Sequence, residues 1–291
     1  MRRRDFLLAA FAAAAAPASN AAPERFGKGL LWRITKGGAA SHIYGTIHVA
    51  DPRIDALPAP VEEAFQRAAS LMLEFVPDPY SRERFLEAAM FLDRQTLAEK
   101  IGAEDFERAL EQLRPIGLSR EFVNKLKPWG VLLNLRAASG ATGALLEAQL
   151  SDRARERRLP VFQIEGVEEQ IFTFDELSMD AQVALLKHSL AHRDELLQLA
   201  ERTLEAYLTG DLQAIWRLRE QFGARYPEVA TYQMALTQRI LYDRSVVMAF
   251  RMQRELRRGN AFVALGALHL YGDKGVLALL EQDGYRARRV Y

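Results

Sequence analysis

Two apolar, strand-like runs in this chain each end in Gly-x-x-His, and their histidines lie 221 positions apart. The first run contains Gly45 and His48, and the second contains Gly266 and His269. Such runs, followed by turn residues, are typical of buried strands. A histidine at the carboxyl end of a strand points into the crevice where open α/β sheets bind ligands. The repetition predicts that both imidazoles converge on one metal ion, whereas a single such histidine is often a strand-end residue satisfied by a backbone hydrogen bond.

A glutamate lies inside a third apolar run, at residues 70–76. Prolines at 77 and 79 bound this run, which we interpret as a central strand carrying Glu74. A buried, ionised glutamate needs a cation, a metal ion or several donors to offset its desolvation. Glu74 is therefore either a ligand or base of the site, or the partner of an arginine.

The rest of the pattern alternates strands with long helical stretches. We expect a hairpin over 30–49, a short helix over 60–69, strands at 160–164, 261–266 and 285–291, a helix over 274–281, and helical regions at 81–159 and 178–258. This order predicts an α/β fold with a mixed β-sheet core that carries the two Gly-x-x-His strand ends. Large helical insertions would cover the crevice of a single domain spanning 22–291.

Composition and missing motifs exclude several classes of function. Three arginines and one aspartate among residues 1–21 contribute +2 to the net charge of +1, so the remainder carries −1 and has no basic excess for nucleic acid. The chain has no cysteine, so any metal must be held by His, Asp, Glu or water. Nucleophile-elbow, phosphate-loop, zincin and dinucleotide motifs are also missing from the sequence.

The first 21 residues have the features of an export signal. Arg-Arg-Asp-Phe-Leu at 3–7 precedes a short apolar run and small residues suited to signal peptidase. This pattern resembles a twin-arginine signal and predicts a periplasmic protein; a general secretory signal is the alternative and gives the same compartment. The run is too short to span a bilayer, and we expect no membrane span in the mature chain.

Three other histidines and one apolar stripe have simpler interpretations. His188 and His192 have the i, i+4 spacing of one helix face, but we interpret them as a solvated or core-flanking pair. His42 is at most a neighbour of the site. The apolar residues at 248, 250 and 252 are interpreted as core packing.

These features together resemble the TraB/GumN family, which is related to the Tiki metalloproteases. The similarity rests on Tyr-Gly-Thr-Ile-His at 44–48, Leu-Glu at 73–74, Lys-Pro-Trp at 127–129, the glutamates at 165–169, the region 243–248 and Leu-Gly-Ala-Leu-His-Leu at 265–270. It implies an α/β core whose site is formed by two Gly-x-x-His histidines and a glutamate, shared with erythromycin-esterase-like and haem-binding ChaN-like proteins. For Tiki proteins it implies metal-dependent peptidase activity with manganese or cobalt.

The sequence departs from this family pattern at two places. Ser245 follows Arg244 where the family usually has asparagine, and Gly166 follows Glu165 where a threonine is usual. Neither change removes an expected ligand, but both alter groups that would orient ligands or substrate.

The resulting hypothesis is a periplasmic, metal-dependent and peptidase-like hydrolase. His48 and His269 bind a divalent ion with Glu74 or Glu165, the other carboxylate acts as general base, and Arg244 stabilises an oxyanion or holds a substrate carboxylate. Zinc, manganese, cobalt and iron all suit such a donor set. The substrate would be a peptide or another small molecule.

Two alternatives remain open. One is a non-catalytic periplasmic protein that binds haem, metal or a peptide, linked in some family members to exopolysaccharide production. The other is a partner-docking role for the helical region, with a vestigial site at the strands.

Overall fold

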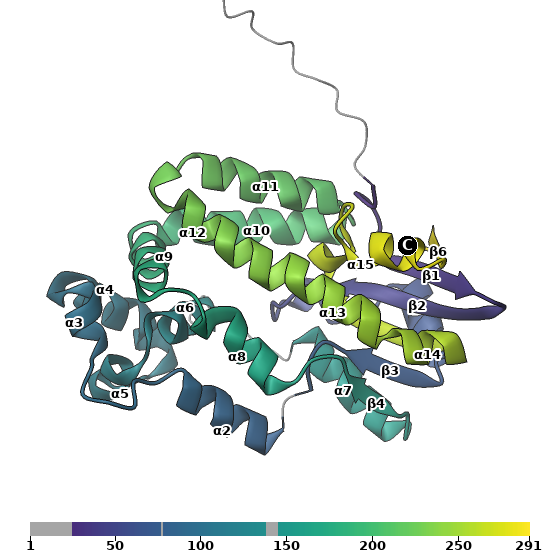
Figure 1. Ribbon diagram of the computed structural model, residues 1–291, viewed down its shortest axis with the longest axis horizontal. Helices are drawn as coiled ribbons and strands as arrows, with labels where there is room; N and C mark the ends of the chain where they lie inside the picture. The colour runs from purple at the N-terminus through teal and green to yellow at the C-terminus, as the bar shows by residue number, and fades with distance from the viewer. Residues whose placement is uncertain (1–24, 77, 138–144) are drawn as a thin grey trace, which may run out of the picture.

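The computed structural model describes residues 25–76, 78–137 and 145–291, whose arrangement is shown in Figure 1. A six-stranded mixed sheet occupies one end of the molecule, and helices surround it and extend away from it. The expected α/β class with a mixed sheet and large helical insertions is thereby confirmed. The expected export signal at residues 1–21 lies outside the described residues.

The elements follow the expected order along the chain. The strands are β1 (Leu31–Lys36), β2 (Ala39–Thr46), β3 (Ser70–Leu73), β4 (Val161–Gln163), β5 (Ala261–Gly266) and β6 (Arg286–Arg289). The helices up to β4 are α1 (Ala59–Gln66), α2 (Pro79–Ala88), α3 (Leu97–Ile101), α4 (Ala103–Leu113), α5 (Arg120–Lys125), α6 (Pro128–Ala137) and α7 (Leu146–Glu156). Those after β4 are α8 (Val167–Asp175), α9 (Met179–Ala191), α10 (Arg193–Leu208), α11 (Leu212–Ala224), α12 (Pro227–Thr237), α13 (Arg244–Arg251), α14 (Gln253–Arg258) and α15 (Val276–Gln282).

The sheet has the strand order β4-β3-β5-β2-β1-β6. The first four strands are parallel, and β1 and β6 continue the sheet in antiparallel pairing. β1 and β2 form the expected hairpin, because Gly37 and Gly38 both take the positive φ that a tight two-residue turn requires. Strands β3 and β5, which start 191 positions apart, thus become direct neighbours.

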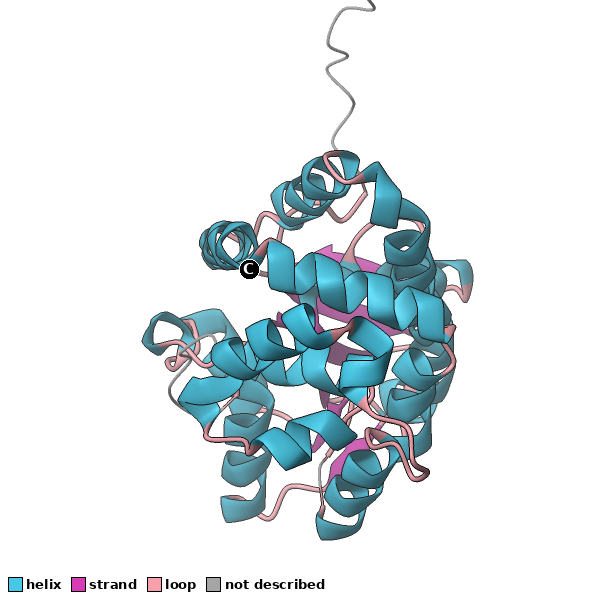
Figure 2. Ribbon diagram, turned by 90° about the vertical axis from the view of Figure 1, so that its left-hand side faces the viewer, coloured by secondary structure: helices cyan, strands magenta, loops and turns pink. Residues whose placement is uncertain are grey.

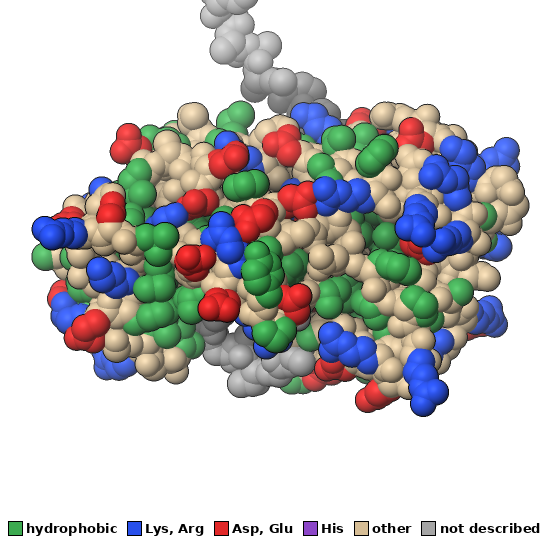
Figure 3. Space-filling view, turned by 60° about the horizontal axis from the view of Figure 1, so that its bottom comes forward, with side chains coloured by type: hydrophobic (Ala, Val, Ile, Leu, Met, Phe, Trp, Pro, Cys, Tyr) green, Lys and Arg blue, Asp and Glu red, His purple; other side chains and the backbone are tan. Residues whose placement is uncertain are grey.

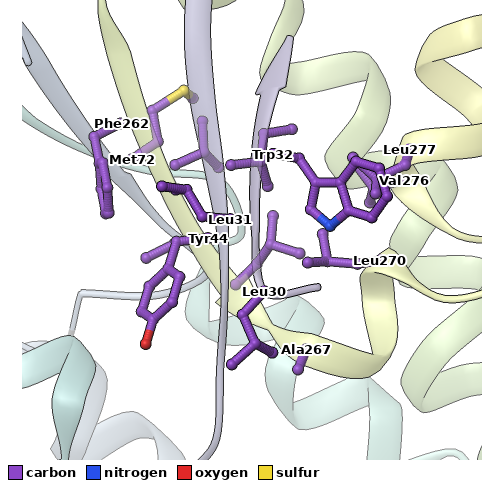
Figure 4. Packing of buried hydrophobic residues seen from close by; sticks show 14 of the residues in the cluster. Leu30, Leu31, Trp32, Tyr44, Met72, Phe262, Ala267, Leu270, Val276 and Leu277 are labelled. Atoms are coloured by element: carbon purple, nitrogen blue, oxygen red, sulfur yellow. The ribbon is translucent and has the colours of Figure 1, made fainter. Parts of the chain in front are cut away.

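The central parallel strands are buried on both faces. All four residues of β3 and the first five of β5 are buried, as expected for strands covered by helices on both sides. Figure 2 shows helices on either side of the strands. Figure 4 shows part of the hydrophobic core, to which Leu31 of β1, Met72 of β3 and Phe262 of β5 contribute side chains.

The helical region has a second hydrophobic cluster of its own. Helices α2 to α6, α8 and α9 contribute to it, and the fully buried Trp129 is its largest side chain. Trp129 stacks on Phe174 and meets Phe85 edge to face. These helices are therefore packed around their own core beside the sheet, whereas α7, α10, α11 and α13 join the cluster of the strands.

A long helical rod crosses the sheet in front of β2 in Figure 1. It begins as α12, continues through a π-helical segment at Gln238–Asp243, and ends as α13. Met248 and Met252 are buried in this rod and its continuation, as expected, but Phe250 is 77 % exposed and its interpretation as core was wrong. Two residues correspond to about 200° around a helix, so Phe250 lies on the face opposite the two methionines.

Within the described residues, no helix combines the length and apolar character needed to cross a bilayer.

Candidate active site

The carboxyl ends of β4, β3, β5 and β2 meet at one edge of the sheet, because these strands are parallel neighbours. Glu74 directly follows β3, and Glu165 lies two residues beyond β4. The Glu165 N–H donates to the Glu74 carbonyl at 2.8 Å, which extends the strand pairing to both glutamates. His48 lies two residues beyond β2, and His269 lies in the 3₁₀ turn Ala267–Leu270 after β5. Four of the five expected site residues thus gather at this edge.

The glycine of each Gly-x-x-His segment makes room for the other segment. A Cβ at Gly45 would lie 2.9 Å from the Ala267 Cα, so only glycine lets the second turn pack against β2. A Cβ at Gly266 would lie 3.2 Å from Glu74 Oε1 and 3.5 Å from His48 Nε2. The missing side chains therefore leave space for the two histidines and the glutamate to approach one another.

Glu74 lies at the centre of the group. Its Oε1 accepts the Gly266 N–H and lies 3.8 Å from His269 Nε2, whereas its Oε2 accepts from Arg244 at 2.7 Å and lies 4.0 Å from His48 Nε2. Burial by itself would raise the pKa of Glu74. The opposing charges at His269, Arg244 and His48, with the Gly266 N–H, outweigh burial and lower this pKa to about 2.

Arg244 bridges the two buried glutamates. Its Nη2 donates to Glu165 Oε2 at 2.6 Å, and its Nε is 3.0 Å from both Glu165 oxygens. Gln170 donates a further hydrogen bond to Glu165 Oε2 at 2.7 Å. Burial nevertheless raises the pKa of Glu165, against the effect of Arg244. The pKa values of Glu74 and Glu165 are thus shifted in opposite directions, which is the pattern that separates a ligand from a proton acceptor.

His269 is buried and held from one side of its ring. Its Nδ1 lies 2.9 Å from Ser245 Oγ, and the ring also hydrogen-bonds to the Leu241 carbonyl in the π-helical segment. Burial lowers the pKa of His269 to about 4, so this imidazole is neutral at pH 7. Ser245 is one of the two departures from the family pattern noted above, and its hydroxyl group orients the ring of His269.

His48 is held by a residue that the sequence did not reveal. Its Nδ1 lies 2.9 Å from Oε1 of Glu147, in the first turn of α7. The same oxygen accepts from Thr46 Oγ1 at 2.5 Å. No local pattern marks Glu147, which is an ordinary acidic residue of a helix about 100 positions from both partners.

The donor set has the chemistry of a site for a divalent ion. The Nε2 atoms of His48 and His269 flank the Glu74 carboxylate, and such nitrogen and oxygen donors suit zinc, manganese, cobalt or iron. Two ligands of a tetrahedral ion lie about 3.4 Å apart, so the separations of 3.8 and 4.0 Å fit after side-chain shifts of about 0.5 Å. Across residues 25–76, 78–137 and 145–291, no three His, Asp or Glu side chains already have the arrangement of a metal centre.

The other histidines lie elsewhere. His42 is opposite Arg33 and Phe262 in the sheet, four residues before the end of β2. His188 is buried at the end of α9, and its ring is 4.7 Å from that of His192 and 4.6 Å from that of Tyr226. The core-flanking interpretation describes His188 well.

Several known proteins are similar to this chain over most of its length. The TraB/PrgY/gumN family matches residues 30–289. The uncharacterized protein YbaP is 24 % identical in Shigella flexneri and 23 % identical in Escherichia coli K12, covering 84 % of this chain and 89 % of YbaP. Metalloprotease TIKI2 of Xenopus tropicalis is 22 % identical and covers 88 % of this chain, which spans 58 % of that protein. No solved structure matches the chain.

Proposed function

We propose that this chain, which belongs to the TraB/PrgY/gumN family, is a metal-dependent hydrolase that cleaves peptide bonds. The observation that carries the proposal is the convergence of two histidines on Glu74, beside the Arg244–Glu165 pair. The similarity to proteins named metalloprotease TIKI2 supports the same class of reaction.

Each residue has a distinct role in the proposed reaction. His48, His269 and Glu74 would hold the ion, since all three present nitrogen or oxygen donors to the same space. A divalent ion bound there supplies Lewis acidity for the attack of water on a carbonyl. Glu165, whose pKa is raised, takes up a proton from water at its carboxylate and returns it to the leaving group.

Arg244 provides the positive charge of the site. Its guanidinium contacts both glutamates and would stabilise an oxyanion or hold the terminal carboxylate of a substrate. This charged lining favours a hydrolase over a haem protein, because the two Nε2 atoms face a carboxylate rather than an apolar crevice.

Two hollows beside the site suit a peptide with a bulky apolar side chain. The larger, of about 410 Å³, lies between α2 and α6 and is lined mainly by apolar groups such as Phe85 and Leu133. Phe75, directly after Glu74, lines both this hollow and a neighbouring one of about 290 Å³. Gln170, which is bonded to Glu165, also lines the larger one. Figure 3, which brings the lower side of the molecule forward, shows hydrophobic side chains interspersed with charged groups there.

The proposed compartment is the periplasm, reached by the twin-arginine route. The support is the Arg-Arg-Asp-Phe-Leu run at 3–7. Replacing Arg3 and Arg4 by lysine should hold the protein in the cytoplasm, as measured by cell fractionation. Export of the variant at the normal level would contradict this route.

The decisive experiment is elemental analysis of protein isolated from its native host, combined with peptide-library assays. Wild-type protein should carry near-stoichiometric metal, and His48→Ala/His269→Ala should lose it. Glu74→Gln should lose metal, whereas Glu165→Gln should keep metal and lose turnover. Metal-free wild-type protein that shows no turnover with added zinc, manganese or cobalt would overturn the proposal, and a Soret band after haem supplementation would favour the binding alternative.

A further inference from the structure

Glu147 is a carboxylate with a side chain only 12 % exposed, and the proposed reaction does not use it. Its Oε1 accepts from Thr46 Oγ1 at 2.5 Å and lies 2.9 Å from Nδ1 of His48. Its Oε2 is buried and has no hydrogen-bond partner among the described residues. Burying an unpartnered carboxylate oxygen costs free energy. The contacts of Oε1 must therefore offset the cost of burying Oε2.

The contact between Glu147 and His48 favours one ring nitrogen as the carrier of the proton. An ionised carboxylate has no hydrogen of its own, so at 2.9 Å a hydrogen on Nδ1 is favoured over a lone pair, which the carboxylate would repel. In a neutral imidazole the lone pair is then on Nε2, and Nε2 is the atom that lies 4.0 Å from Glu74 Oε2. Glu147 and Glu74 thus lie on opposite sides of the same ring.

The two histidines of the site differ in how much they need such a partner. His269 is 4 % exposed and is fixed by packing, by Ser245 and by the Leu241 carbonyl. The side chain of His48 is 47 % exposed, so the protein packs much less tightly around it. A carboxylate held in place by Thr46 restrains both the tautomer and the rotation of this more exposed ring.

We propose that Glu147 is a positioning residue that holds His48 as its Nδ1–H tautomer, with Nε2 directed at Glu74. The inference rests on the proposed function only in that the oriented Nε2 serves the same site. It assigns a role to a third acidic residue, Glu147, which comes from α7.

The tautomer can be measured directly, without metal and without turnover. Two-bond proton–nitrogen correlation spectra of purified, metal-free protein labelled with ¹⁵N-histidine should show His48 as the Nδ1–H form, assigned with a His48→Gln variant. Glu147→Ala should shift His48 to the Nε2–H form or to a mixture. Glu147→Gln should restore the Nδ1–H form, because its amide oxygen still accepts a hydrogen bond. Glu156→Ala, at the exposed end of the same helix, is the matched control and should change nothing.

Zinc titration calorimetry adds a second readout. Glu147→Ala should weaken Zn²⁺ binding by about 10- to 100-fold, and Glu147→Gln by less. An Nε2–H tautomer in the wild type, or a Glu147→Ala spectrum identical to that of the wild type, would overturn the role of Glu147. If the wild type binds no Zn²⁺ but shows the expected tautomers, the metal-dependent reaction fails while the positioning role stands.

Discussion

The chain carries two histidine pairs with opposite surroundings. His48 and His269 are 221 positions apart, yet both direct Nε2 toward the buried carboxylate of Glu74. His188 and His192 are four positions apart, and their rings pack against each other and against Tyr226, at 4.6 and 4.3 Å between ring centroids. The pair that is close in sequence is embedded in aromatic rings, and the distant pair faces charged groups.

The difference lies in what fixes each ring nitrogen. In the distant pair, Nδ1 of each ring lies against an oxygen, of Glu147 or Ser245, and Nε2 faces the site. In the helical pair, Nε2 of His188 is buried and has no hydrogen-bond partner among the described residues, and His192 contacts Glu195 at 3.3 Å. A histidine becomes a candidate ligand when the fold orients its lone pair toward other donors, which the spacing i, i+4 alone does not achieve.

The sharpest test of this contrast removes one pair at a time. His48→Ala/His269→Ala should lower kcat/KM for a library-selected peptide by at least about a hundredfold, because ion-holding groups are lost. His188→Ala/His192→Ala should leave turnover unchanged, measured at a temperature where circular dichroism shows both variants folded. Equal losses in the two variants would mean that the two pairs are not functionally different.

The charged groups around the distant pair give the next largest effect. Arg244→Ala leaves two buried glutamates without their shared cation and should lower the free energy of unfolding by about 3–5 kcal/mol. Arg251, at the other end of α13 from Arg244, forms a partly exposed ion pair with Glu169 of α8, and Arg251→Ala should cost less than about 1 kcal/mol. Urea unfolding at pH 7 measures both. Similar costs would show that burial does not distinguish the Arg244 cluster from a surface ion pair.

The sequence predicted those parts of the site that local patterns carry. The strand runs, their closing glycines and the glutamate after β3 are all visible within a few residues, and their order predicted the mixed sheet. For Glu74, the sequence left open a site role or an arginine partner, and the structure pairs it with Arg244 beside both histidines.

The parts that the sequence did not predict depend on packing between distant elements. Glu147 reaches His48 only because α7 packs along β3 and β4. The Leu241 carbonyl contacts His269 from a π-helical segment. No residue pattern in the sequence predicted this segment. Phe250 was assigned to the core because it was grouped with Met248 and Met252 as apolar residues at helical spacing. Its position two residues from each methionine places it on the opposite helix face instead.

Replacing a glycine by alanine compares the backbone of the site, at Gly45, with that of the helical region, at Gly223. Gly45→Ala places a Cβ 2.9 Å from the Ala267 Cα, so the turn carrying His269 must move. We expect a loss of about 1–3 kcal/mol in the free energy of unfolding, together with weaker metal retention. Gly223→Ala in α11 meets only the end of the flexible Gln233 side chain, at 3.0 Å, and should be neutral or stabilising by up to about 1 kcal/mol. A tolerated Gly45→Ala would mean that the two Gly-x-x-His segments do not need their close approach.

The smallest expected effect is a pH dependence that belongs to the helical pair. Burial lowers the pKa of His188 below its ordinary 6.5, with His192 acting in the same direction and Glu228 and Glu195 opposing it. The unfolded chain therefore binds more protons than the folded one as pH falls below 6.5, so this histidine lowers stability in acid and not in base. His188→Phe, which keeps a ring against Phe222 and Tyr226, should remove this component. Urea unfolding of wild type and variant at pH 7.5 and pH 5 measures it.

The part of the acid sensitivity that remains in His188→Phe should come mainly from His269, whose pKa is lowered to about 4, so that its window runs from 6.5 down to that value. His42 adds to it, because burial, Arg33 and Arg67 lower its pKa as well. At His269, burial at the sheet edge lowers the pKa against the opposing effect of Glu74, and Arg244 acts in the same direction as burial. At His188, burial and His192 lower the pKa, and the carboxylates of Glu228 and Glu195 oppose them. If His188→Phe loses stability in acid as steeply as the wild type, the ring of His188 takes up its proton without unfolding. Its surroundings would then tolerate the protonated ring better than the aromatic contacts indicate.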